Sequence, residues 1–206
     1  SFHFQLLLLM VLSILCGCSD NASEAKKNGA LTNNATTLFS KITSETSGIT
    51  FQNEIQEDME MNFLTYPYMY VGGGVAVGDL DKDGLQDLYL VSNQGPNKLY
   101  KNKGDFIFED ITDSAGVSDY IGFTTGVTFL DINNDSWLDI YISKAGSLKD
   151  DAGRRNKLFI NNKNGTFSEA AAAWGLDDPG YTTQVYQLDY DKDGDLDVYI
   201  ANYPPT

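Results

Sequence analysis

The chain has 206 residues, with 29 acidic and 14 basic side chains and a formal net charge of −15. This acidic excess argues against nucleic acid as a partner, because nucleic acid phosphates are bound by Lys and Arg. The only histidine is His3, and the only cysteines are Cys16 and Cys18. From residue 19 onward the chain therefore has no disulfide, no serine–histidine or cysteine–histidine catalytic pair and no histidine-ligated metal site.

The first predicted element is an apolar run over residues 6–15. It is too short to cross a bilayer, which takes about 20 residues, and it favours a secretory signal peptide over residues 1–18. The run ends in Leu15-Cys16-Gly17-Cys18, which resembles the lipobox of bacterial lipoproteins and implies that Cys18 is the lipidated first residue of the mature protein. The alternative is a plain signal peptide with an incidental cysteine. Because the chain starts at Ser1 and not at Met, we expect the start of the signal to lie outside it.

Residues 19–37 are polar and have no hydrophobic periodicity. Such a composition predicts a flexible tether, with a root-mean-square span of about 25 Å. The folded part is therefore expected over residues 38–206.

That folded part repeats itself. A unit that begins with alternating acidic residues occurs at 79–90, 131–142 and 189–200, so that successive copies start 52 and 58 residues apart. Two further segments recur in phase: 97–102 (NKLYKN) matches 156–161 (NKLFIN), and 108–117 (FEDITDSAGV) matches 167–176 (FSEAAAAWGL). A looser copy of the latter lies at 39–49. Repetition at one period indicates stacked supersecondary units.

Short β-type runs alternate with turn residues inside each unit. Residues 75–77, 127–129 and 185–187 lead into the acidic segment, and residues 88–91, 140–142 and 198–200 leave it. Asn164-Gly165 predicts a tight hairpin turn between two further strands, at 157–161 and 166–169. About four short strands in each repeat are typical of a propeller blade. Helical periodicity is weak, and residues 169–174 are expected to form one helical turn at most.

Each acidic segment carries oxygen-bearing side chains at positions 1, 3, 5 and 9, and position 7 can add a backbone carbonyl. Because Ca²⁺ takes six to eight oxygen ligands, this spacing predicts one ion in each loop, about three in all. The predicted ligands are Asp79, Asp81, Asp83, Leu85 and Asp87 in the first loop, Asp131, Asn133, Asp135, Trp137 and Asp139 in the second, and Asp189, Asp191, Asp193, Asp195 and Asp197 in the third. An EF-hand is rejected, because position 12 is Leu90, Ile142 or Ile200 where that loop needs Glu.

Surface turns without metal also use Asp, Asn and Gly. Three copies with oxygen atoms at the same four positions favour calcium, because clustered carboxylates repel one another without a counterion. The second loop has Asn133 in place of an aspartate, and Ser136 in place of the glycine that suits a positive φ. We therefore predict that the second site is the weakest, so that substituting Asp135 costs less stability than substituting Asp83 or Asp193.

The D-x-D-x-D-G-x-x-D-[LV] loops, with Gly72-Gly-Gly-Val-Ala-Val or Gly126-Val-Thr-Phe before them and N-K-L-[YF] after them, resemble FG-GAP/VCBS repeats, the blade units of the integrin α-subunit propeller. The phasing with F-x-[DE]-[IA]-[TA]-x-x-[AS]-G-[VIL] looks most like the extracellular family that includes cartilage acidic protein and bacterial lipoprotein relatives. The resemblance covers residues 38–206. It implies an all-β fold, a partial β-propeller with calcium in its blade loops, and an ASPIC/UnbV-type domain that this segment does not contain. Closed propellers have four to eight blades, so about three blades predict a truncated chain.

Two classes of function remain open at this stage. The first is a calcium-binding extracellular scaffold that mediates protein or glycan binding, or adhesion, at the cell envelope, held by its lipid anchor at the outer membrane or cell surface. The second is a polysaccharide-active hydrolase with paired carboxylates, or an accessory module of an enzyme whose catalytic part is missing. We favour the first, non-enzymatic class, because nearly all clustered carboxylates are already assigned to calcium.

Two groups of side chains recur or stand out apart from the loops. Tyr89, Tyr141 and Tyr199 occupy the same place in each unit and are expected to pack between blades, although they could form an aromatic ligand platform. Arg154 and Arg155 lie in an insertion relative to the first unit. We expect them to be a solvated charge pair, and the alternative is a binding loop.

Overall fold

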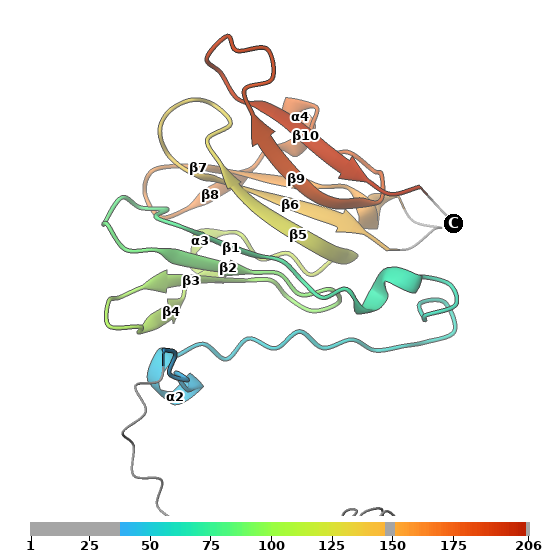
Figure 1. The fold of residues 1–206 in the computed structure, drawn as a ribbon, viewed down its shortest axis with the longest axis horizontal. Helices are drawn as coiled ribbons and strands as arrows, with labels where there is room; N and C mark the ends of the chain where they lie inside the picture. The colour runs from blue at the N-terminus through green and yellow to red at the C-terminus, as the bar shows by residue number, and fades with distance from the viewer. Residues whose placement is uncertain (1–37, 147–150, 205–206) are drawn as a thin grey trace, which may run out of the picture. The chain divides into compact units, whose positions relative to one another are not determined.

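The computed structural model describes residues 38–146 and 151–204, and the described residues from 41 onward form one compact unit. The predicted signal peptide (1–18), the tether (19–37) and the lipidation site Cys18 lie outside the described residues. Antiparallel strands dominate the described part, where the helices are single turns (Figure 1), so the predicted all-β fold is confirmed. No helix in the described residues has the length and apolar character needed to cross a membrane.

The first sheet is a meander with strand order β1-β2-β3-β4, drawn in green in Figure 1. Its strands are β1 (Val75–Gly78), β2 (Asp87–Leu90), β3 (Lys98–Asn102) and β4 (Phe108–Asp110). The helical turn α3 (Thr112–Ala115) follows and ends at Gly116, which has a φ of 73°. Glycine suits this position because it adopts the left-handed conformation without a steric penalty.

The second sheet repeats this arrangement with strand order β5-β6-β7-β8. Its strands are β5 (Phe123–Leu130), β6 (Asp139–Ala145), β7 (Lys157–Asn161) and β8 (Phe167–Glu169), with a 3₁₀ turn η2 (Ala152–Arg154) before β7 and the helical turn α4 (Ala171–Trp174) after β8. The predicted Asn164-Gly165 hairpin turn is confirmed, with a φ of 82° at Gly165. Strands β5 and β6 extend beyond the predicted ranges, because they pair along seven registered positions with a bulge at Thr124/Gly126.

A third pair, β9 (Thr182–Leu188) and β10 (Asp197–Asn202), starts the same pattern again. Upstream of β1, the helical turn α2 (Ser44–Ser47) ends at Gly48 with a φ of 75°, and the 3₁₀ turn η1 (Pro67–Tyr70) follows. A helical turn that ends at a left-handed glycine thus precedes β1, as it precedes β5 and β9. The looser sequence copy at 39–49 therefore corresponds to a structural repeat.

The core lies between the faces of successive sheets. One cluster of buried side chains joins the first sheet to the second; it comprises Ala76, Leu80, Tyr89, Val91, Leu99, Ala115, Val117, Val127, Phe129, Ile140, Ile142, Phe159 and Phe167. A smaller cluster joins the second sheet to the third pair and comprises Leu130, Tyr141, Leu158, Ala171 and Val185. Each fully buried aliphatic or aromatic side chain contributes about 1.5–3 kcal/mol to folding. Face-to-face stacking of four-stranded meanders is the propeller-like architecture that the repeats predict.

Two glycines allow the first strands of neighbouring sheets to approach closely. A Cβ atom on Gly74 would lie 2.9 Å from the Cα atom of Gly126. A Cβ atom on Gly126 would lie 2.8 Å from the backbone oxygen of Thr183 at β9. The glycines that precede the acidic loops in the sequence motif are therefore required by the spacing of β1, β5 and β9.

The recurrent tyrosines behave as predicted in the two complete sheets. Tyr89 and Tyr141 are fully buried, and their hydroxyls donate to the carbonyl oxygens of Val117 (2.8 Å) and Leu176 (2.7 Å). Each acceptor follows the glycine that ends a helical turn, so the tyrosine ties its sheet to that turn. Tyr199 differs, because its side chain is 62% exposed in the third pair.

The prediction of a solvated arginine pair is wrong for Arg154. This side chain is buried: it contacts Asp151, donates from Nε to the Pro179 carbonyl (3.1 Å) and lies over the Tyr181 ring. Arg155 is more exposed and pairs with Asp177 at 2.8 Å. Besides the local Asp151, the partners of Arg154 come from residues 179–181, so its burial could not be predicted from the neighbouring sequence.

Candidate metal centre

The three acidic loops occupy equivalent places in the fold. Each connects the first and second strands of its unit, and the aspartate at position 9 is the first residue of β2, β6 or β10. The loops start directly after β1, β5 and β9. The sequence repeat thus corresponds to a structural repeat, and the predicted ligands of each loop lie in one tight strand–loop–strand connection.

The position 9 aspartate fixes each loop to its sheet. In the first loop, Asp87 accepts hydrogen bonds from the amides of Leu80 (3.1 Å) and Asn102 (2.9 Å), one at each carboxylate oxygen. Asp139 accepts the equivalent pair, from Ile132 (3.1 Å) and Asn161 (2.8 Å).

Burial raises the pKa of both the Asp87 and the Asp139 carboxyl groups, although the amide hydrogen bonds oppose this shift. In the third loop, Asp197 accepts from the amide of Tyr190 at 2.8 Å and is exposed. The position 9 carboxylate therefore stabilises the loop through hydrogen bonds to backbone amides, with or without a cation.

Positions 1, 3 and 5 organise the interior of the loop through their carboxylates and amides. Asp79 accepts hydrogen bonds from the amides of Asp83 (3.2 Å) and Gly84 (2.9 Å). Asp81 accepts from the same Asp83 amide at 3.3 Å, and Asp83 accepts from the amide of Leu85 at 2.9 Å. The Leu85 hydrogen bond lowers the pKa of the Asp83 carboxyl group.

The second loop repeats these contacts from its own positions 1, 3 and 5. Asp131 accepts hydrogen bonds at 2.9 and 2.7 Å, Asn133 accepts one at 3.1 Å, and Asp135 accepts one from Trp137 at 2.8 Å. The network therefore depends on the side-chain oxygen at each position, which asparagine supplies as well as aspartate does.

The loop backbone is left-handed at two positions. Position 6 has a φ of 87° at Gly84, 98° at Gly194 and 67° at Ser136, as the alignment predicts. Position 4 is also left-handed, at Lys82 (61°), Asn134 (55°) and Lys192 (64°). Sequence reasoning missed position 4, because only the asparagine among these residues has an intrinsic preference for that conformation.

Two of the loops bring three carboxylates to one point. Oxygen atoms of Asp79, Asp81 and Asp87 all lie within 4.8 Å of one another, as do those of Asp189, Asp191 and Asp197. Their separation and chemistry fit a hard divalent cation, which prefers oxygen ligands at about 2.3–2.6 Å.

Position 5 stands apart from these groups, since Asp83 and Asp193 turn one oxygen to the amide of position 7. The second loop has Asn133 where a third carboxylate would stand. Asp83, Asp193 and the ligands of the second loop, together with the carbonyls of Leu85, Trp137 and Asp195, stay predictions.

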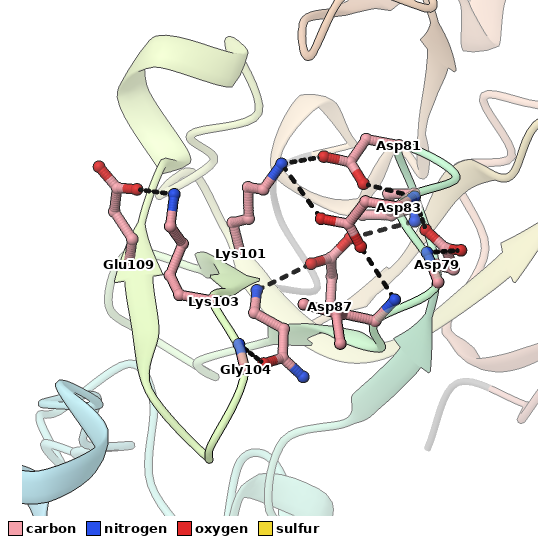
Figure 2. Close-up of polar contacts among 12 residues, drawn as sticks. Asp79, Asp81, Asp83, Asp87, Lys101, Lys103, Gly104 and Glu109 are labelled. Atoms are coloured by element: carbon pink, nitrogen blue, oxygen red, sulfur yellow. Dashed lines mark hydrogen bonds and ion pairs between the residues drawn. The ribbon is translucent and has the colours of Figure 1, made fainter.

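Two lysines that the sequence did not single out contact the loops. Figure 2 shows Lys101 of β3 directed at the first loop, where its ammonium contacts Asp81 and lies 3.5 Å from Oδ2 of Asp83. The hydrogen bond to Asp81 raises the pKa of Lys101. In the second loop, Nζ of Lys163 lies 3.0 Å from Oδ2 of Asp135. Lys103, which directly follows β3, pairs instead with Glu109 at 3.3 Å (Figure 2).

The asparagine that ends the N-K-L segment is a further functional residue that sequence reasoning missed. The Asn102 side chain donates to the Gln86 carbonyl at 2.9 Å. Asn161 is buried and donates to two carbonyls, that of Leu138 in the second loop (3.1 Å) and that of Leu80 in the first loop (2.8 Å). Its recurrence at 102 and 161 was the available signal.

Comparison with known proteins identifies the family of these repeats. The FG-GAP-like repeat family matches residues 70–142 and 147–200, which include all three loops. Cartilage acidic protein 1 of Xenopus tropicalis is 32% identical over 136 residues, which is 65% of this chain and 20% of that protein. The Homo sapiens protein of the same name is 30% identical over 190 residues, 84% of this chain and 27% of its own length. The chain thus spans about a quarter or less of the length of these relatives.

Proposed function

Since the chain belongs to the FG-GAP-like repeat family, we propose that it is a calcium-stabilised, non-enzymatic scaffold that binds protein or glycan outside the cell. The observation that carries the proposal is the convergence of three carboxylates in the first loop and again in the third. Calcium supplies positive charge at these points and joins residues at both ends of each loop, so it would hold neighbouring strands together.

Charge and energetics support a structural role for the ion. Extracellular calcium modules bind at about 0.1–1 mM. At millimolar calcium, a site with a dissociation constant of about 0.1 mM adds about 1–2 kcal/mol to the free energy of unfolding, provided that only the folded chain binds. Three such ions would also offset part of the net charge of −15.

The chemistry available to the folded part supports a role other than catalysis. Residues 19–206 contain no histidine and no cysteine. The carboxylates that cluster in the described residues belong to the loops, where the backbone amides of the same loop already engage them. We therefore prefer a binding scaffold to a hydrolase.

The predicted export signal and the relatives support an extracellular location. The animal relatives are named after cartilage, a tissue rich in extracellular matrix. Attachment to the outer membrane or cell surface through Cys18 is part of the proposal and follows from the lipobox resemblance.

Calorimetric titration with Ca²⁺, together with melting curves in calcium and in EDTA, tests the metal part. We expect uptake at millimolar calcium and a melting temperature that falls in EDTA. The double variant Asp79→Asn/Asp189→Asn should lose most of this response, whereas Asp113→Asn, an exposed aspartate outside the loops, should keep it. No heat of binding together with an unchanged melting temperature in EDTA would refute calcium binding.

The binding part is tested on the full-length protein with a glycan array and a polysaccharide hydrolysis screen in parallel. Retained ligand without turnover is the expected result. Turnover that disappears when a carboxylate outside the loops is changed would instead establish an enzyme.

A further inference from the structure

In each of the first two loops, a lysine ammonium forms an ion pair with the loop carboxylates. Lys101 reaches the first loop from near the end of β3, and Lys163 reaches the second from the turn between β7 and β8. The two lysines do not occupy matching places in the repeat, because alignment of Asn102 with Asn161 puts Ile160 opposite Lys101 and Gly104 opposite Lys163. Each loop therefore obtains its lysine from a different position.

The lysines use the oxygen atoms that the loop backbone leaves free. Asp81 and Asp83 each accept a backbone amide at Oδ1, and their Oδ2 atoms face Lys101 (Figure 2). In the second loop, Asp135 likewise accepts the Trp137 amide at Oδ1 and faces Lys163 with Oδ2. A divalent cation that takes these Oδ2 atoms meets an ammonium group already there.

We propose that Lys101 and Lys163 are built-in competitors of the cation. This inference rests on the calcium binding of the proposed function. Without calcium, the ammonium offsets the repulsion among the carboxylates and keeps the loop folded. With calcium, the like charges repel and the ammonium must leave, so the lysine weakens the site. The consequence is a loop that is stable at low calcium and fills only at the higher concentrations found outside the cell.

The variant Lys101→Gln tests this, with Lys103→Gln as its matched control. Lys103 lies two residues away on the same segment, and its pair with Glu109 does not involve the loop. Calcium titration should show the affinity of one site rising about threefold to tenfold in Lys101→Gln, because one competing charge is gone. In EDTA the same variant should melt at a lower temperature than the wild type. Lys103→Gln should match the wild type in both measurements.

The conservative variant Lys101→Arg keeps the charge and should retain wild-type affinity and the wild-type melting temperature in EDTA. Lys163→Gln should reproduce the behaviour of Lys101→Gln at the second loop. Together these variants separate competition from a simple loss of packing, which would lower stability with and without calcium and leave affinity unchanged or weaker.

These measurements distinguish failure of the calcium proposal from failure of the competition proposal. If the wild type and all variants take up no calcium, both the proposed metal role and the competition are overturned. A lower melting temperature of Lys101→Gln in EDTA would then assign the lysine a purely structural role. If the wild type binds calcium and Lys101→Gln binds it equally or less tightly, the scaffold proposal stands and the competition is overturned.

Discussion

Single residues in the acidic loops carry costs and contacts that can be measured separately from metal binding. Position 6 is the clearest case, because the same backbone turn is made by glycine in two loops and by Ser136 in the other. A non-glycine residue in the left-handed region costs about 1 kcal/mol. The second loop therefore folds at a local cost in free energy. Its lower negative charge separately weakens the predicted calcium site.

Ser136→Gly should raise the free energy of unfolding by about 0.5–1 kcal/mol, because glycine removes the left-handed strain at a φ of 67°. Urea denaturation in EDTA measures this effect without the metal. The reverse change, Gly84→Ser, should lower stability by a similar amount. Equal stability of Ser136→Gly and the wild type would show that the serine is not strained.

Asn161→Ala should lower the free energy of unfolding by about 1–3 kcal/mol, because the buried carbonyl of Leu80 and the partly buried carbonyl of Leu138 each lose a donor. Thermal and urea denaturation measure the loss. Asn162→Ala is the matched control: the Asn162 side chain is exposed and bonds to the side chains of Thr166 and Ser168, so the change should stay within about 0.5 kcal/mol. Similar losses in both variants would contradict a bridging role for Asn161.

At the scale of elements, hydrogen bonds and one buried ion pair tie the sheets to the segments that connect them. The tyrosines of β2 and β6 bond to the chain just after α3 and α4. Lys144 of β6 pairs with Asp119, in the connection between α3 and β5, at 2.5 Å, with 1% and 6% of the side chains exposed. These contacts fix where each helical turn and connection lie against the strands.

Tyr89→Phe and Tyr141→Phe should each lower the free energy of unfolding by about 1–2 kcal/mol, because the carbonyls of Val117 and Leu176 lose a hydroxyl donor at an unchanged packing volume. Chemical denaturation checks this. Tyr120→Phe, which removes a hydroxyl from a ring that is 69% exposed, serves as the control and should be close to neutral. A cost confined to the control would contradict the assignment.

Lys144→Met should destabilise the fold by about 3–5 kcal/mol, because Asp119 is left buried without its partner. The double variant Lys144→Met/Asp119→Asn should recover much of this loss, and a double-mutant cycle in urea measures the coupling.

Burial also lowers the pKa of Lys144 below its ordinary value of 10.5. The unfolded chain therefore holds this proton more tightly than the folded chain does. The stability contribution of the group should accordingly rise as the pH increases through the lowered pKa towards 10.5, relative to Lys144→Met. Parallel pH profiles for the two proteins would contradict this.

For the whole molecule, the repeat predicted most of what is local. Strand positions, the Asn164-Gly165 turn, the one helical turn expected within residues 169–174 and the burial of Tyr89 and Tyr141 all follow from patterns within one unit. Tertiary contacts did not follow, since no local pattern specifies which side chain of another strand, turn or sheet meets a loop. Lys101, Lys163 and Asn161 were therefore missed, and so was the burial of Arg154 against a segment 25 residues later.

Under the proposed calcium binding, Asn161 would couple the first loop to the second. Its backbone amide binds Asp139 of the second loop, and its side chain binds the Leu80 carbonyl of the first. Ordering of either loop should therefore favour the ordered form of the other. Calcium at one loop would then raise the affinity of the other, and the two effects would be equal in size. Calcium uptake by this pair is then expected to be cooperative, with a sigmoidal isotherm that becomes hyperbolic when Asn161 is replaced by alanine.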